Sequence, residues 1–281
     1  MKNTRNQPVN IPVSKLRPFE GHPFKVRDDE EMNTLIESIQ TQGMFSPLVV
    51  RPIENTYEYE VISGHRRLHA AVKAGITEVP ALIYALDRDS AAIAVVDSNL
   101  HREHILPSEK AFAYKLKMEA LNHQGITCGQ VGHKSRDNVS DTESGRTVQR
   151  YIRLTYLIPE FLDKMDNGEI ALSVGVELSF LDEQSQYDVL EQCEINDCTP
   201  SYSQAVEMKK RFQDRQLPTY DIGKIMAREK PNQRETIKIP SARLEGKIPR
   251  GYTVQQKEDF IVKAVDHYNK YRARQRDWDS R

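Results

Sequence analysis

A short stretch around Gly64 carries the residues best suited to binding an anion. Gly64 lies between an apolar strand ending at Ile62 and a helix expected over residues 65–74, and Arg66 and Arg67 occupy that helix's first turn. Unpaired N–H groups and the helix dipole make a helix start positive, and guanidinium forks match phosphate oxygens. The combination predicts a phosphate-binding site. The alternative is an ordinary strand-to-helix connection whose arginines face water, because single-glycine turns are common before helices.

A second basic pattern lies on a helix expected over residues 145–154, with Ser144 as its cap. Its outer face carries Arg146, Gln149, Arg150 and Arg153. Arginine and glutamine are base-reading side chains. With a short helix near residues 125–131 and a polar turn containing Lys134 and Arg136, the pattern predicts a helix-turn-helix whose second helix enters the major groove. The alternative is a solvated helix face, and the turn is long for a minimal motif.

Metal and thiol chemistry have weaker support. His65 and His69 lie one helical turn apart, as nearly do His101 and His104, but no third zinc ligand can be identified. The three cysteines form no CxxC pair, so neither a disulfide framework nor a cysteine zinc site is indicated. The absence of a dense carboxylate cluster also disfavours a two-metal nuclease.

The composition is that of a highly charged protein with two or three small domains. Of 281 residues, 38% are hydrophobic and 29% are charged, and the net charge is −1. That charge does not indicate a nucleic-acid binder, so a DNA-binding surface must arise from local segregation of charge. No apolar run approaches the roughly 20 residues of a membrane helix, and the first residues lack the apolar core of a signal peptide. We therefore expect a cytoplasmic location without a membrane partner.

Periodicity predicts an α+β chain in three parts. Residues 8–105 alternate strands and helices, which indicates a small mixed α/β domain. Residues 106–215 lose the strand signals and are expected to form an all-helical DNA-binding domain. Residues 216–281 are expected to be a linker with one strand at 236–239, followed by an amphipathic helix over 253–276.

Four motifs in order resemble the ParB-type (ParB/RepB-like) partition proteins, with a ParB/sulfiredoxin-like N-terminal domain. They are GMFSPLVVR at residues 43–51, VISGHRR at 61–67, NLHRE followed by LPSEKA over 99–111, and TVQRYIRL at 147–154. The resemblance spans about residues 8–195. Several ordered motifs are a far more specific signal than one glycine pattern.

The resemblance implies a homodimeric DNA clamp that binds CTP with Mg²⁺. It loads on double-stranded DNA at a centromere-like site and closes by self-engagement of its nucleotide domains. It assigns to the nucleotide Gly64, His65, Arg66, Arg67, Asn99 and Arg102, with Asn99 near the magnesium and residues 42–47 beside the base. It also implies a ParA-type ATPase as partner and a nucleoid- or plasmid-associated location.

Two departures from the family pattern affect the expected chemistry. His65 stands where the family commonly has glutamate, and Ser98 stands where a glutamate usually precedes the asparagine, with Asp97 one residue earlier. A missing carboxylate affects CTP hydrolysis more than CTP binding, so weak hydrolysis stays open and no catalytic residue is identified. Sulfiredoxin chemistry is disfavoured because Gly64 replaces the nucleophilic cysteine.

The C-terminal helix does not resemble the leucine-rich dimerisation helix of chromosomal relatives, which favours a plasmid or mobile-element protein. The rival hypothesis is a DNA-binding transcriptional regulator whose nucleotide pocket is degenerate.

Overall fold

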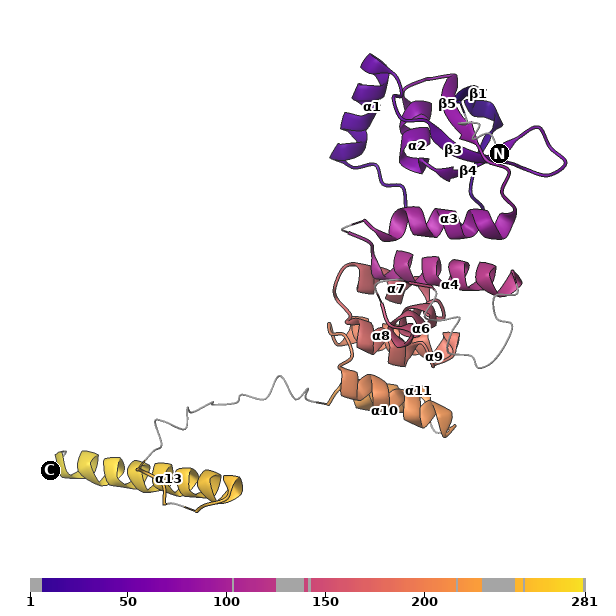
Figure 1. Ribbon diagram of the computed structural model, residues 1–281. Helices are drawn as coiled ribbons and strands as arrows, with labels where there is room; N and C mark the ends of the chain where they lie inside the picture. Colours follow the sequence, from indigo (N-terminus) through magenta and orange to yellow (C-terminus); the bar gives the residue numbers. More distant parts are fainter. Residues whose placement is uncertain are drawn as a thin grey trace. The chain divides into compact units, whose positions relative to one another are not determined.

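The structure is a computed structural model that describes residues 7–102, 104–124, 139–140, 143–215, 217–228, 246–249 and 251–279 (Figure 1). The chain forms two compact units, Met1–Arg228 and Glu229–Arg281. The predicted helix at 125–131, the polar turn with Lys134 and Arg136, and the predicted strand at 236–239 lie outside the described residues. None of the described helices is long and apolar enough to cross a membrane.

A mixed five-stranded sheet forms the centre of the N-terminal part. Its strands are β1 (Val9–Pro12), β2 (Leu16–Pro18), β3 (Leu48–Pro52), β4 (Tyr59–Ser63) and β5 (Glu78–Ile83). The strand order is β1-β5-β3-β4-β2, antiparallel between β1 and β5 and between β3 and β4, and parallel in the other two pairs. A short 3₁₀ turn, Val13–Lys15, separates β1 from β2.

Helices cover both faces of this sheet. α1 (Glu30–Gln42), capped by Asp29, and α2 (His65–Lys73) bury residues such as Met32 and Ala71 against one face. α3 (Arg88–Leu100) packs Val95 beside Ile62 on the other face. α4 (Pro107–His123) lies along α3 (Figure 1). The chain is thus a mixed α/β fold followed by a helical region, as expected.

The helical region is built around one apolar core. It comprises α6 (Gly145–Leu154), α7 (Pro159–Asp166), α8 (Leu172–Leu178), α9 (Glu183–Ile195), α10 (Tyr202–Gln213) and α11 (Thr219–Met226). Buried side chains from every one of these helices meet in that core, including Leu154, Phe161, Leu178, Val189, Met208 and Ile225. α4 contributes Ala111 to the same core, so α4 packs against both parts of the first unit.

The start of the expected linker differs from the prediction. Residues 219–226 form α11, and Ile222 and Ile225 are fully buried against the helical core. The sequence does not predict α11, because a helix of two turns has too few positions to show a clear hydrophobic period. The surrounding proline- and lysine-rich composition is typical of a linker. In the second unit, α13 (Val254–Asp279) is a long helix, as expected. The domain boundaries near residues 105 and 215 stay predictions.

Candidate functional site

The turn at Gly64 places the start of α2 beside the end of α3. Gly64 is the N-cap of α2 and adopts a left-handed conformation with φ 102°. A Cβ added there would lie 2.5 Å from Leu48 Cδ2 and 3.0 Å from Arg67 Nη2, so the turn requires glycine for both its backbone and its space. The cavity formed there, of about 150 Å³, is lined by Ser63, Gly64, His65, Arg66, Arg67, Ser98, Asn99 and Arg102. All six residues that the family resemblance assigns to the nucleotide therefore line one cavity.

Arg67 is held in place by backbone carbonyls. Its Nη1 donates hydrogen bonds to the carbonyl oxygens of Ser46, at 2.6 Å, and Pro47, at 2.8 Å. The side chain is half-buried, and this burial lowers the pKa of Arg67 from its ordinary value. The guanidinium therefore joins α2 to the loop before β3, part of the stretch 42–47 that was expected to lie beside a base.

Arg66 is held by carboxylates instead. Its Nη2 lies 3.2 Å from Asp29 Oδ1 and 3.3 Å from Glu31 Oε2, and its Nη1 lies 3.4 Å from Asp29 Oδ2. These pairs are partly solvated, since the side chains of Arg66, Asp29 and Glu31 are 31%, 40% and 85% exposed. Arg66 lines the cavity, but its guanidinium already has acidic partners.

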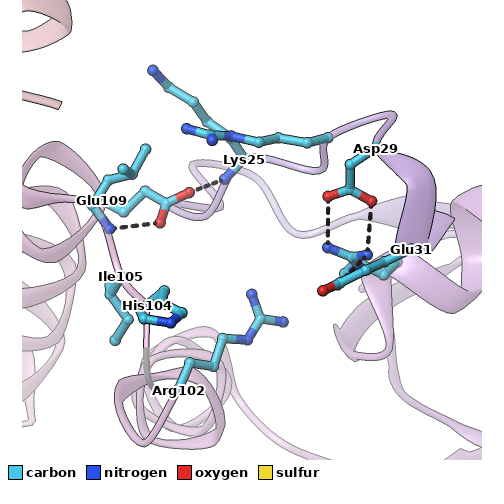
Figure 2. Close-up of a pocket in the computed structure, with 10 residues that line it drawn as sticks. Lys25, Asp29, Glu31, Arg102, His104, Ile105 and Glu109 are labelled. Carbon is cyan, nitrogen blue, oxygen red and sulfur yellow. Dashed lines mark hydrogen bonds and ion pairs between the residues drawn. The ribbon is translucent and has the colours of Figure 1, made fainter. Parts of the chain in front are cut away.

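Arg102 is the least engaged of the three guanidinium groups. No hydrogen bond or ion pair joins it to another side chain in the described part of the chain, and it projects into a second cavity (Figure 2). Burial lowers the pKa of Arg102, and Arg66 lowers it further while Glu109 opposes the shift. The guanidinium carbon lies over the Phe24 ring, 5.8 Å from its centroid, and the guanidinium N–H groups have no acceptor among the described residues, so they are available to an anion.

The second cavity has a volume of about 620 Å³ and shares Arg66 and Arg102 with the first. That volume lies within the roughly 300–1,000 Å³ usual for small-molecule sites, whereas the first cavity alone is smaller. Its lining also includes residues that the sequence does not mark as anion-binding, namely Lys25, Arg27, Asp29, Glu31, His104 and Glu109. The sequence signal for the first four is the dense charge of residues 25–31, which is equally typical of a solvated helix start.

His65 lines the first cavity, and its imidazole ring is neutral. Its ring stacks on His22 with centroids 3.7 Å apart, and its Nε2 accepts a hydrogen bond from the Phe19 N–H at 3.5 Å. Burial, then His22 and Arg102, lower the pKa of His65 to about 3. The Nδ1 of His22 lies 2.8 Å from the carbonyl oxygen of Phe24, and burial also lowers the pKa of His22.

Asn99 is the residue expected near a magnesium ion. It is buried and its Nδ2 donates to the Val95 carbonyl at 2.8 Å, which leaves its Oδ1 as the atom suited to a cation. Asp97 does not replace the missing carboxylate, because its Oδ1 lies 2.6 Å from the Nζ of the buried Lys117 on α4. Ser98 therefore lines the cavity at the position where the resemblance leads us to expect glutamate.

The histidine pairs do not converge as metal ligands. His69 Nε2 lies 2.8 Å from Asp28 Oδ1 rather than beside His65. Within the described ranges, no group of three or more His, Cys, Asp or Glu residues is placed to hold a metal ion.

The predicted DNA-facing helix is α6, and Ser144 caps it through a hydrogen bond from the Thr147 N–H at 3.2 Å. Arg146 and Arg150 are exposed and have no hydrogen-bond or ion-pair partner among the described residues, and Gln149 is half-buried. Arg153 differs. It donates to Ser179 O at 2.8 Å and lies over the Phe180 ring, 4.1 Å from its centroid.

Comparisons with known proteins show which proteins this chain resembles. Residues 1–100 match the family described as the ParB N-terminal domain. The chromosome-partitioning protein Spo0J of Thermus thermophilus is 37% identical over 163 residues, covering 58% of this chain and 56% of that protein. A probable chromosome-partitioning protein ParB of Chlamydia trachomatis is 32% identical over 208 residues, covering 73% of this chain and 70% of that protein. The chain spans about half the length of many curated relatives that it matches.

Two solved structures of C-terminally truncated ParB from Caulobacter crescentus are also similar. One, complexed with CTP-γ-S, is 24% identical, covers 66% of this chain and 97% of that chain, and has a TM-score of 0.32. The other, complexed to the centromeric parS site, is 20% identical, covers 78% of this chain and 98% of that chain, and has a TM-score of 0.42.

Proposed function

Because the chain belongs to the ParB family of partition proteins, we propose that it binds a specific DNA site through α6 and CTP through the cavity at the start of α2. Occupancy of the cavity biases the N-terminal region toward pairing with that of a second copy, and the homodimer closes on DNA as a clamp. The observation that carries this proposal is the meeting of six residues from α2 and the α3 end on one cavity.

In this proposal, different residues of the cavity bind different parts of the nucleotide. Arg102 and the N–H groups at the start of α2 bind phosphate oxygens, and Arg67 fixes the loop beside the base through Ser46 and Pro47. Asn99 Oδ1 would hold Mg²⁺, which would neutralise phosphate charge when bound. With Ser98 in place of a carboxylate, the described lining of the first cavity offers no carboxylate to activate water, and the pKa of His65, lowered to about 3 by burial, makes that ring a poor base, so hydrolysis is slow or absent.

The biological role that fits is the segregation of a plasmid, mobile element or chromosome, with a ParA-type ATPase as partner and a nucleoid- or plasmid-associated location in the cytoplasm. We assign the nucleotide response to residues 8–105 and DNA binding to the helical region that follows. The C-terminal extension assists dimerisation or contacts DNA. The names of the curated relatives support the partition role.

A second function has two observations in its favour. Arg66 already has two acidic partners, and Ser98 replaces the usual carboxylate, as in a pocket that no longer binds nucleotide. The protein would then be a DNA-binding transcriptional regulator. Its binding to one DNA site would depend on salt but would not change with CTP.

Calorimetric titration of the purified protein with each of the four nucleoside triphosphates separates these functions. We expect CTP to bind most tightly. Crosslinking between the N-terminal regions of two copies should then increase with CTP and further with specific DNA. A protein that binds its DNA site but shows neither CTP binding nor any change in crosslinking is the simple regulator.

A further inference from the structure

An acidic segment, residues 28–31, covers the basic side of α2. Asp28 holds two of its residues, with Oδ1 2.8 Å from His69 Nε2 and Oδ2 2.6 Å from Lys73 Nζ. Asp29 and Glu31 hold the third, Arg66, at the cavity end of the helix. Figure 2 shows Asp29 and Glu31 together on one side of the larger cavity, with Arg102 projecting toward the same space.

The contacts on Arg66 use the donors that a phosphate group would need. Asp29 engages both terminal nitrogens of the guanidinium in a two-pronged pair, and Glu31 takes a second contact on Nη2. Bidentate recognition of a phosphate uses this same edge. A carboxylate and a phosphate cannot both occupy it, so the two compete.

We propose that Asp29 and Glu31 set the affinity of the nucleotide site by occupying Arg66 until a polyphosphate displaces them. This inference rests on the proposed function, because it concerns the ligand of the same cavity. The acidic segment acts as a substitute anion that prevents Arg66 from binding stray phosphate, and a ligand must bind Arg102 and the start of α2 well enough to displace it.

The structure allows this displacement at small cost. Asp29 Oδ1 also caps α1 by accepting the Met32 N–H at 2.8 Å, and this bond survives when the guanidinium leaves. The pKa of Asp29 is lowered, first by that cap and then by Arg66, so the carboxylate stays ionised whether or not Arg66 is present. Exposed ion pairs are weak because water screens them, so each carboxylate should weaken anion binding by roughly two- to fivefold.

Inorganic triphosphate is the probe that isolates this competition, because it carries the phosphates without a base. Its affinity is measured by calorimetry without divalent cations for the full chain and for Asp29→Asn, Glu31→Gln and the double variant. Asparagine caps helices as well as aspartate, so Asp29→Asn removes the charge and keeps α1 intact. Glu30→Gln is the matched control, because Glu30 is exposed in the same turn and has no side-chain partner among the described residues.

We expect roughly two- to fivefold tighter binding for each single variant, a larger gain for the double variant, and no gain for Glu30→Gln. Binding by the double variant alone would also support the competition. If the wild-type protein binds triphosphate and the two variants bind it equally or more weakly, the carboxylates orient Arg66 and the inference is wrong. If Glu30→Gln gains as much as they do, general charge explains the effect and the inference is again wrong. If no form binds triphosphate or CTP, the proposed function fails as well.

Discussion

At the scale of single residues, the three arginines of the candidate site differ in what already holds them. Arg67 donates to backbone carbonyls and Arg66 to carboxylates, whereas the Arg102 guanidinium lies over the Phe24 ring and has no hydrogen-bond or ion-pair partner among the described residues. The sequence predicts the residue types but not these states, because the partners come from loops distant in the chain. Removal of Arg102 should therefore lower ligand affinity most directly, because its guanidinium has no hydrogen-bond or ion-pair partner among the described residues.

Replacing Arg102 with glutamine should therefore weaken CTP binding strongly without unfolding the protein. A charged hydrogen bond contributes roughly 1.5–3 kcal/mol, which corresponds to a loss of about 10- to 100-fold in affinity. Calorimetry measures this loss. Arg27→Gln is the control, because Arg27 lines only the larger cavity and should lose less than about threefold. Equal losses in both variants would mean that general positive charge, and not the position of Arg102, attracts the ligand.

His65 gives the stability of the fold a specific pH dependence. Its pKa is about 3 in the folded protein against 6.5 for the unfolded chain, so the unfolded state binds more protons between these values. The contribution of His65 to the free energy of unfolding should therefore be complete above pH 6.5. Below that pH the free energy of unfolding should fall by up to about 1.4 kcal/mol per pH unit. In urea denaturation at pH 7, 6 and 5, His65→Gln should show a shallower decline than the wild type. An unchanged slope would show that His65 is protonated in the folded state.

At the scale of elements, the turn between β4 and α2 depends on one glycine. Gly64→Ala should destabilise the fold by about 2–4 kcal/mol, because it combines left-handed strain with a contact on Leu48. Gly75→Ala should cost only about 1 kcal/mol, since Gly75 has φ 73° but nothing within 4 Å of an added Cβ. Thermal unfolding compares the two. Equal losses would mean that strain alone explains the requirement and that the space beside Leu48 relaxes freely.

Along α6, two neighbouring arginines should act differently. Arg150→Ala should weaken specific DNA binding by about 1–3 kcal/mol and leave the melting temperature unchanged, because Arg150 is exposed and contacts no described side chain. Arg153→Ala should lower the melting temperature, because it removes the bonds to Ser179 and the contact with Phe180. DNA titration at fixed salt, together with thermal unfolding, measures both. If Arg153→Ala lost DNA binding while keeping normal stability, Arg153 would contact DNA, as the sequence predicts.

These elements show where sequence reasoning succeeds and where it stops. Local rules predicted the Gly64 turn and the Ser144 cap, because capping and left-handed turns depend on adjacent residues. They could not predict that Asp97 pairs with Lys117 or that Arg153 turns back to Ser179. Those pairings depend on how distant helices pack, and a charged side chain has no sequence signal for its partner.

At the scale of the first unit, α4 connects the candidate cavity to the predicted DNA-facing helix. Three successive residues of its first turn contact three separate segments of the chain. Ser108 donates to Asp166 of α7, Glu109 accepts from the Lys25 N–H beside the larger cavity, and Lys110 pairs with Glu143 just before α6. A shift of the cavity wall on ligand binding would therefore reach α6 through a single helical turn.

Lys110 is where this connection can be tested. If it couples the two sites, CTP changes DNA affinity by some factor and DNA changes CTP affinity by the same factor. Lys110→Met removes both the ion pair to Glu143 and the contact of the Lys110 ammonium with the Tyr151 ring, so the factor should move toward one while each ligand alone binds nearly as before. Lys164→Met is the control, because its pair with Glu169 lies at the end of α7 and joins neither site. Titrations of each ligand with and without the other give the factor in both directions, and an unchanged factor in Lys110→Met would place the coupling elsewhere than the first turn of α4.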